Sequence, residues 1–100
     1  MKRQRRSLAA FQVDSSEAVV GGAPGSYFIP ADRSYIHLRC PCGRCEKHNA
    51  LPLVPGRGGY AWRLSGQPGK HSLSPSIHWF EPDGRKTHWH GHLRDGSFEG

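Results

Sequence analysis

Three cysteines within six residues are the part of this chain whose residue types and spacing point most directly to chemistry. The stretch "CPCGRC" holds Cys40, Cys42 and Cys45, and Gly43 permits the tight turn that lets closely spaced sulfur atoms converge on one ion. Thiolate-rich tetrahedral coordination favours Zn²⁺ over harder metals, and an iron centre stays open as the alternative. The cysteines therefore predict one zinc ion per chain, against the simpler interpretation that they are buried, inert thiols.

Three sulfur ligands leave a tetrahedral ion one ligand short, and the histidines of "THWHGH" are the candidates for it. His88, His90 and His92 occupy alternate positions, so on a β-strand they would share one face, with Trp89 on the opposite face and in the core. One or two of these imidazoles could then reach the cysteines. His48 follows Cys45 by three residues and is a further candidate. For His37, His71 and His78 the spacing indicates ordinary strand or turn positions.

The elements that must position these ligands are short strands. The chain of 100 residues contains 13 Gly and 8 Pro, which interrupt stretches rich in β-branched and aromatic residues. One small domain with a modest core fits this length. We expect an all-β or β-rich fold, a small antiparallel sheet or sandwich stapled by one zinc knuckle, either Rieske-like or zinc-ribbon-like.

Local patterns predict individual elements. Asp83-Gly84 is a hairpin turn signal that makes "SIHWF" and "KTHWH" antiparallel neighbours and places the histidines on the return strand. Residues 34–40 alternate polar and apolar side chains, as a strand leading into the cysteines would. The stretch "DSSEAVV" predicts one helical turn capped by Ser15 or Asp14. Each tryptophan lies in a short apolar stretch, so the three should share one aromatic core: Trp62, Trp79 and Trp89.

Positive charge is concentrated at the start of the chain. The formal net charge is +6, and from residue 7 onward ten basic residues face eight acidic ones, leaving +2. We therefore divide the chain into a basic arm, residues 1–7, and one zinc-binding domain, residues 8–100. The arm is expected to bind nucleic acid or an acidic protein surface, or to be a solvated tail. The expected contact residues are Lys2, Arg3, Arg5, Arg6, Arg39 and Arg44.

The cysteine and hydropathy patterns also bear on the compartment. Three closely spaced cysteines do not form a disulfide framework, which favours a reducing compartment. No apolar run approaches membrane-spanning length, and "LAAFQV" is too short for a signal-peptide core. We expect a cytoplasmic protein without a membrane contact, located in the virion or the host cytoplasm if it is encoded by a phage.

The succession "CPCG.C", "LPL", a tryptophan-containing strand, "SLSPSI" and "HWHGHLRDGSF" resembles an uncharacterised family of small bacterial and phage proteins known as domain of unknown function 6527. The resemblance covers residues 35 to 99. It implies that Cys40 and Cys42 are knuckle ligands and His90 the histidine ligand, with Cys45 matching after insertion of Arg44. Thr87 stands where the family has its last cysteine, so His88 is the natural replacement.

The same resemblance implies where such a protein acts. Members of the resembled family occur in phages and beside bacterial ubiquitin-like conjugation genes, which suggests accessory roles in phage biology or defence. The ending is also similar to the second half of a Rieske motif. A two-iron cluster is nevertheless not expected, because the chain contains no Cys-x-His pair and lacks the second cysteine of the motif.

Three functions are compatible with the sequence. The first is a non-catalytic zinc domain that binds nucleic acid or a protein, since four protein ligands close a zinc site. The second is a structural component of a phage particle or another nucleoprotein assembly. The third is a metal-dependent hydrolase in which His88, His90 and His92 bind the metal and Asp95 or Glu81 polarises a water. Ser74 and Ser76 are interpreted as turn and strand residues around Pro75, because no trustworthy Ser/His/Asp order is present.

Overall fold

Two β-sheets and one short helix make up the described part of the protein. The structure is a computed structural model that describes residues 7–42, 45–53, 61–81 and 84–100. The five-stranded sheet contains, in spatial order, β1 (Ser7–Ala9), β9 (Ser97–Glu99), β8 (Thr87–Arg94), β7 (Lys70–Phe80) and β6 (Arg63–Gln67). The four-stranded sheet contains β2 (Phe11–Gln12), β3 (Ser26–Phe28), β4 (Tyr35–Arg39) and β5 (His48–Pro52). This is the β-rich architecture that the short alternating stretches predict.

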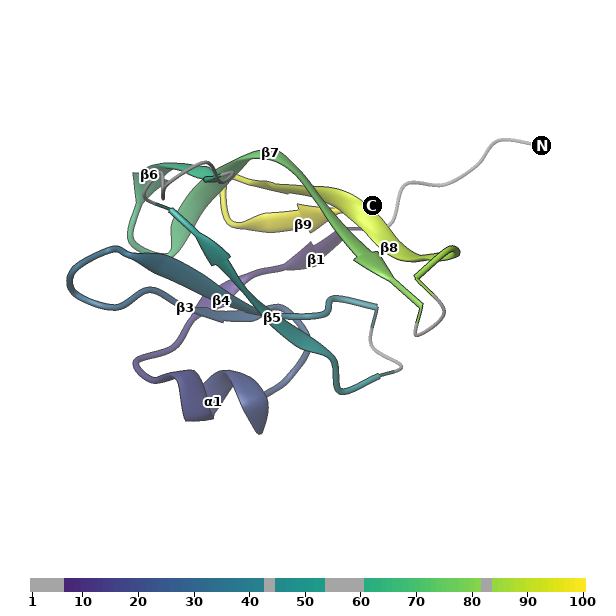
Figure 1. The fold of residues 1–100 in the computed structure, drawn as a ribbon. Helices are drawn as coiled ribbons and strands as arrows, with labels where there is room; N and C mark the ends of the chain where they lie inside the picture. Colours follow the sequence, from purple (N-terminus) through teal and green to yellow (C-terminus); the bar gives the residue numbers. More distant parts are fainter. Residues whose placement is uncertain (1–6, 43–44, 54–60, 82–83) are drawn as a thin grey trace.

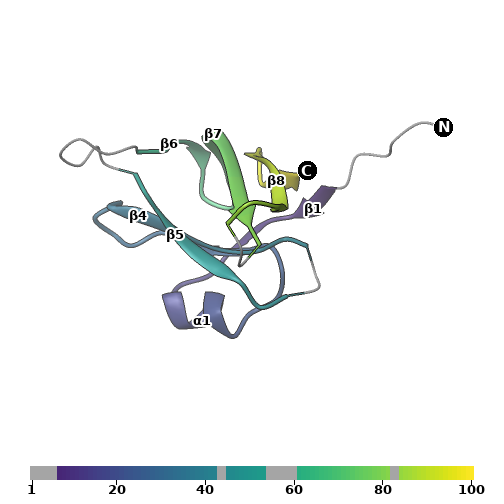
Figure 2. The ribbon, with the colours of Figure 1, turned by 45° about the vertical axis from the view of Figure 1, so that its right-hand side comes forward.

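The two sheets lie face to face, with the five-stranded sheet above the four-stranded one in Figures 1 and 2. Neighbouring strands are antiparallel except for the parallel pair β2 and β3. One apolar cluster lies between the sheets, because each contributes one face of alternating residues. Its fully buried members include Ile36 and Leu38 from β4 and Leu93 and Phe98 from β8 and β9.

The predicted aromatic core is confirmed. Trp79 belongs to the buried cluster, and Trp62 and Trp89 pack against it. The rings of Trp79 and Trp89 meet edge to face with centroids 5.8 Å apart, and Trp89 meets Phe98 in the same way at 6.1 Å. Such edge-to-face pairs are favourable because the positive ring edge meets the negative face of its partner.

Helix α1 (Ser16–Val20) forms where the capping signal predicts it. The hydroxyl of Ser15 accepts a hydrogen bond from the Ala18 amide at 3.1 Å, which satisfies one of the free amides of the first turn. At the other end, the Arg39 guanidinium donates to the carbonyls of Val19 and Val20. The helix therefore covers the outer face of the four-stranded sheet at β4. In the described ranges no helix is long and apolar enough to cross a membrane.

The pairing of β7 with β8 positions the candidate site and contains two irregularities. The pair forms the predicted hairpin, although residues 82 and 83 of its turn lie outside the described residues. Near the hairpin end, Trp79 pairs with Trp89 but Phe80 pairs with Thr87, so β8 has one extra residue, His88. Further along, Leu73 pairs with Leu93 but Ile77 with Gly91, so β7 has extra residues around Pro75. Proline has no amide hydrogen for a ladder and is found at such bulges.

Candidate functional site

The three cysteines and one histidine converge at the end of the sandwich. One ligand atom from each of Cys40, Cys42, Cys45 and His88 lies within 4.8 Å of every other. The Cys42 and Cys45 sulfur atoms are 3.4 Å apart, and Cys45 Sγ is 3.2 Å from His88 Nε2. In a tetrahedral site with Zn–S bonds of about 2.3 Å, neighbouring sulfur atoms lie about 3.8 Å apart. The donor set and spacing therefore suit one metal ion, consistent with one zinc per chain.

The sequence left two histidines open as the fourth ligand, and the structure places His88 in the cluster. The reason is the extra residue in β8, because a β-bulge breaks the period-2 alternation and re-aims the side chain at the inserted position. The first choice, His90, lies elsewhere: its Nε2 is 3.0 Å from the Ser76 hydroxyl. His48 is also outside the cluster, since its Nδ1 lies 2.8 Å from His37 Nε2.

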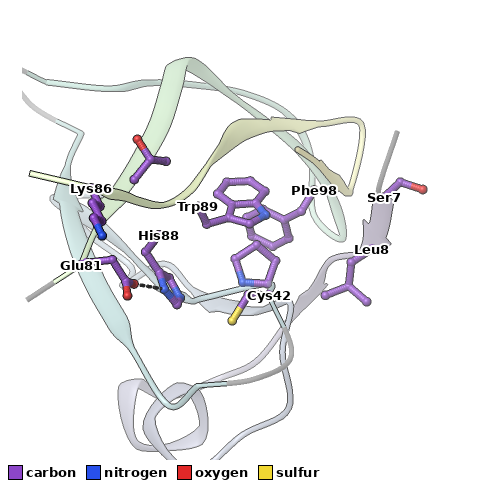
Figure 3. Close-up of a pocket in the computed structure, with 10 residues that line it drawn as sticks. Ser7, Leu8, Cys42, Glu81, Lys86, His88, Trp89 and Phe98 are labelled. Atoms are coloured by element: carbon purple, nitrogen blue, oxygen red, sulfur yellow. Dashed lines mark hydrogen bonds and ion pairs between the residues drawn. The ribbon is translucent and has the colours of Figure 1, made fainter. Parts of the chain in front are cut away.

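A carboxylate holds the other side of the His88 ring. His88 Nδ1 lies 2.5 Å from Glu81 Oε1, as the dashed line in Figure 3 marks. A metal-binding imidazole that donates its second N–H to a carboxylate is fixed in orientation and made a better donor. Glu81 follows β7 directly, so this contact also ties the cluster to the β7–β8 hairpin. A cavity of about 790 Å³ adjoins the pair, and Trp89 and Phe98 line its far side.

Burial makes the thiol of Cys40 harder to ionise. Cys40 is fully buried, and this burial raises the pKa of its thiol to about 12, although a hydrogen bond from the Cys42 backbone acts in the opposite direction. A bound cation reverses that preference, because a coordinating thiol gives up its proton to the metal site. Binding of a metal by Cys40 would therefore have to displace a firmly held thiol proton.

The three-histidine site that a metal-dependent hydrolase would need is not formed in the described ranges. His88 joins the cysteines and His90 contacts Ser76, and the one group of potential metal ligands found is the Cys₃His cluster. The carboxylates expected to polarise a water are also placed differently. Glu81 contacts His88, and Asp95 lies in the β8–β9 turn, where its amide donates to the Ser72 hydroxyl at 2.9 Å.

A second cluster lies on the outer face of β7 and β8. Ser76 contacts His90 across the two strands, because His78 pairs with His90 and Ser76 is therefore its diagonal neighbour on the same face. Ser76 is half-buried and His90 is exposed. The Trp62 indole N–H donates to the Ser76 carbonyl oxygen at 3.3 Å, which anchors the backbone behind the hydroxyl. This is the one serine–imidazole hydrogen bond found among the described residues.

Aromatic rings extend this cluster along the same face. The imidazole of His78 stacks on His90 with centroids 4.5 Å apart and on Phe80 at 4.0 Å. His78 Nε2 lies 2.7 Å from the Thr87 hydroxyl, so the middle ring of the stack is held from β8. His78 is an exposed residue of β7, which agrees with the ordinary strand or turn position expected for it. Its role as a neighbour of the Ser76–His90 pair was not foreseen from the sequence.

The expected partner-binding residues are mostly not described. Lys2, Arg3, Arg5, Arg6 and Arg44 lie outside the described residues, and Ser7, placed in the arm, is the first residue of β1. Arg39 is only 7% exposed and donates to helix carbonyls, so it supports α1 instead of forming a binding surface. The correction follows from the position of α1, which covers the polar face of β4.

Comparison with protein-family models assigns the chain to a family. Residues 13–100 match the model of a family described as bacterial ubiquitination-like system serine protease (BubE). The chain belongs to the BubE family. No curated protein matches it, and neither does any solved structure. The match extends over β3 to β9 and therefore includes both the Cys₃His cluster and the Ser76–His90 pair.

The sequence predicts Ser76 as a turn or strand residue beside Pro75, and the structure places it in β7; its contact with His90 was not foreseen. Its signal was present in "SLSPSI", because a proline inside an otherwise regular strand indicates a bulge, and bulges re-aim side chains near functional sites. What the sequence could not supply was the partner. His90 is 14 residues away and becomes a neighbour only through the β7–β8 register.

Proposed function

We propose that this protein is a serine protease of a bacterial ubiquitination-like system, with Ser76 as nucleophile and His90 as general base. The observation that carries the proposal is the 3.0 Å contact between the Ser76 hydroxyl oxygen and His90 Nε2 in a chain of the BubE family. Nucleophile and base in hydrolases of this type lie about 2.6–3.2 Å apart. Both side chains are accessible to a substrate on the outer face of β7 and β8.

The contact supports ordinary acyl transfer. His90, with its proton on Nδ1, accepts the Ser76 proton at Nε2 as the serine oxygen attacks the scissile carbonyl carbon. The protonated imidazole then donates to the leaving amine, and the carbon–nitrogen bond breaks to leave an acyl-serine. A water molecule, deprotonated by the same nitrogen, hydrolyses that ester and restores Ser76.

Two contacts prepare the pair for this chemistry. The stacked His78 ring limits rotation of the His90 imidazole, and Thr87 fixes His78 in turn. Trp62 holds the Ser76 carbonyl, so the backbone that carries the nucleophile is fixed from a second side. Such positioning matters because a displacement of about 1 Å in a reacting group can cost about a hundredfold in rate.

The metal has a structural role in this proposal. Cys40, Cys42, Cys45 and His88 would supply all four ligands of a zinc ion, and a site closed by four protein ligands stabilises the fold without activating water. Through His88 the site fixes the beginning of β8, and His90 lies two residues further along the same strand. The Cys₃His cluster thereby helps to position His90, the general base, without contacting the reacting groups.

Hydrolysis of a peptide substrate tests the proposal. Wild-type protein should cleave, and Ser76→Ala and His90→Gln should each lose about a thousandfold or more in kcat, as removal of a nucleophile or its base does. The matched control is Ser74→Ala, an exposed serine of the same bulge, which should keep its activity. Equal activity in wild type and Ser76→Ala would return the protein to the non-catalytic zinc-binding module that the sequence alone favoured.

Three further expectations stay predictions beside this proposal. The resemblance to domain of unknown function 6527 is one, and a role in a phage or nucleoprotein assembly is the second. The third is contact of the basic arm with nucleic acid or an acidic protein surface. None of them conflicts with a protease, because a basic arm could bring the enzyme to an acidic partner without entering the reaction.

A further inference from the structure

The free edge of β5 leads toward the Ser76–His90 pair. β5 is the last strand of the four-stranded sheet, so one of its sides has no neighbouring strand in that sheet. Its other side pairs with β4, where Cys40 N donates to Lys47 O at 2.8 Å and Leu53 N to Ser34 O at 3.0 Å. In an antiparallel pair alternate residues bond to the same neighbour, so the backbone groups of His48, Ala50 and Pro52 point to the free side.

The contacts on the free side agree with this assignment. The Pro52 carbonyl accepts from the Trp62 amide at 2.7 Å, and the Ala50 amide donates to the side chain of Asn49 at 3.0 Å. The hydrogen bond from the Ala50 amide to the Asn49 side chain is local, so the amide can readily donate to the backbone carbonyl of another chain instead. In the described part of the chain, no bond is formed by the His48 amide, the His48 carbonyl or the Ala50 carbonyl on this side. Within the described ranges, a row of backbone donors and acceptors is thus open at the edge.

A groove lies at the beginning of this edge, and one side of it is next to the proposed active site. It has a volume of about 450 Å³ and separates β5 from β7, which run side by side in Figures 1 and 2. At one end it is bounded by His78, whose ring stacks on His90. Beyond the groove, Trp62 donates both to the carbonyl of Pro52 at the end of β5 and to the carbonyl of Ser76, so it connects β5 to the strand that carries the proposed nucleophile.

We propose that the free edge of β5, through His48 and Ala50, binds the substrate as an added β-strand and presents its scissile bond to Ser76. This inference rests on the proposed function, and it names the substrate class as a peptide segment in extended conformation. An added strand obtains most of its affinity from main-chain hydrogen bonds, so sequence matters little at the residues that pair with β5. A folded loop that cannot extend is excluded as a substrate.

The surroundings of the edge fit one peptide strand. His78 and Phe80 form an aromatic wall on the β7 side, and Phe80 is 48% exposed. Side chains of an extended peptide alternate, so every second residue would meet this wall while the residues between would point to solvent. The aromatic wall is therefore the place where side-chain preference arises.

The edge is tested with a backbone change. Ala50 is exposed, and proline is tolerated on an edge strand whose amide faces solvent, so Ala50→Pro removes one donor without disturbing the pairing with β4. Ala50→Ser is the matched control because it keeps the amide. With a quenched octapeptide library as substrate, we expect Ala50→Pro to lose about tenfold in kcat/KM, the usual effect of one hydrogen bond, and Ala50→Ser to match wild type.

A small serine-reactive phosphonate separates this inference from the proposed function. The probe does not need the groove, so Ser76 should react at equal rates in wild type and both variants. Peptides of the best-cleaved sequence, N-methylated one residue at a time, should lose cleavage at every second position near the scissile bond, because only alternate amides face β5.

The contrary results are distinct. If Ser76 is labelled normally, any one of three results overturns the added-strand inference alone. These results are full peptide cleavage by Ala50→Pro, uniform tolerance of N-methylation, and the cleavage of no octapeptide in the library. A wild-type dimer that Ala50→Pro dissociates also overturns it, since the edge would then hold a second copy of the chain. Absence of Ser76 labelling in wild type refutes the proposed function, and the inference falls with it.

Discussion

His88 uses both nitrogen atoms of its ring, and this is the contact at residue scale on which the metal site depends most. Nε2 faces the cysteines and Nδ1 faces Glu81 at 2.5 Å. The carboxylate fixes the ring and increases the electron density at the metal-binding nitrogen. Glu81 directly follows β7. Its side chain therefore makes the metal affinity of the Cys₃His cluster depend on whether the β7–β8 hairpin is well ordered.

Glu81→Gln should therefore weaken zinc binding by about 10- to 100-fold, the usual effect of losing such a partner. Competition against a chromophoric chelator measures the change. Glu46→Gln is the control, because Glu46 is an exposed carboxylate close to Cys45 in the sequence but outside the cluster. Equal affinity in Glu81→Gln and wild type would mean that the contact with His88 does not orient a ligand.

Individual residues also show which parts of the candidate site could be predicted from the sequence. The cysteines were identified correctly because three within six residues, beside proline and glycine, leave few structural alternatives. The choice of His90 over His88 as the fourth ligand was wrong, since it depends on one extra residue in β8 that the period-2 pattern does not reveal. Ser76 was correctly expected to be a turn or strand residue, but its contact with His90 depends on the β7–β8 register, which the sequence does not reveal.

At the scale of elements, the cluster joins the end of β4 to the beginning of β8. Those segments belong to different sheets, and in small domains metal-binding energy is largely folding energy. Elements defined by local signals were predicted well: the helix by its Ser15 cap and the β7–β8 hairpin by Asp83-Gly84. Pairings between distant segments, such as β1 with β9, carry no local signal and were not predicted.

Cys42→Ser should consequently lower the melting temperature by about 15 °C or more, since about 1 kcal/mol corresponds to about 4–8 °C in a domain of this size. Calorimetry of zinc-loaded protein measures the shift. A strong chelator supplies the internal control, because it should lower the wild-type melting temperature to the value of the variant and leave the variant unchanged. An unaltered melting curve in the variant would show that the cysteines do not stabilise the fold.

At the scale of the whole molecule, a buried polar pair lies between the sheets. The hydroxyl of Tyr27 lies 2.9 Å from His71 Nδ1, and both residues are almost completely buried. Burial, with a smaller effect of Arg33, holds the pKa of His71 below its ordinary value, so the folded protein keeps this imidazole neutral. The pKa of His37 is lowered as well, by burial first and by His48 second.

The sign of the resulting pH dependence follows from these directions. Below the ordinary histidine pKa of about 6.5 the unfolded chain binds protons that folded His71 refuses, so stability falls as the pH falls. We expect a smaller loss of melting temperature between pH 7.5 and 5.5 in His71→Gln, which keeps an acceptor for Tyr27 but does not titrate. Metal ligands titrate equally in both proteins and cancel in the comparison. Parallel pH profiles would contradict this assignment.

The basic arm is a whole-molecule property because it holds most of the net charge. Deletion of residues 1–6 removes four of the basic residues and should leave zinc content and melting temperature unchanged. If the partner is nucleic acid, affinity for an oligonucleotide should fall, and the salt dependence should flatten by nearly one unit of log–log slope per lost phosphate contact. A scrambled arm of equal charge is the control and should bind like wild type. Unchanged affinity and slope in the deletion would make the arm a solvated tail.

The central claim is that Ser76, activated by His90, is a nucleophile. Covalent labelling with a serine-reactive fluorophosphonate, followed by peptide mapping in a mass spectrometer, tests it most directly because no substrate has to be known. The account predicts one modified residue, Ser76, with labelling lost in Ser76→Ala, strongly slowed in His90→Gln and unchanged in Ser74→Ala. Modification of another serine in zinc-loaded, folded protein, or of none, would contradict it.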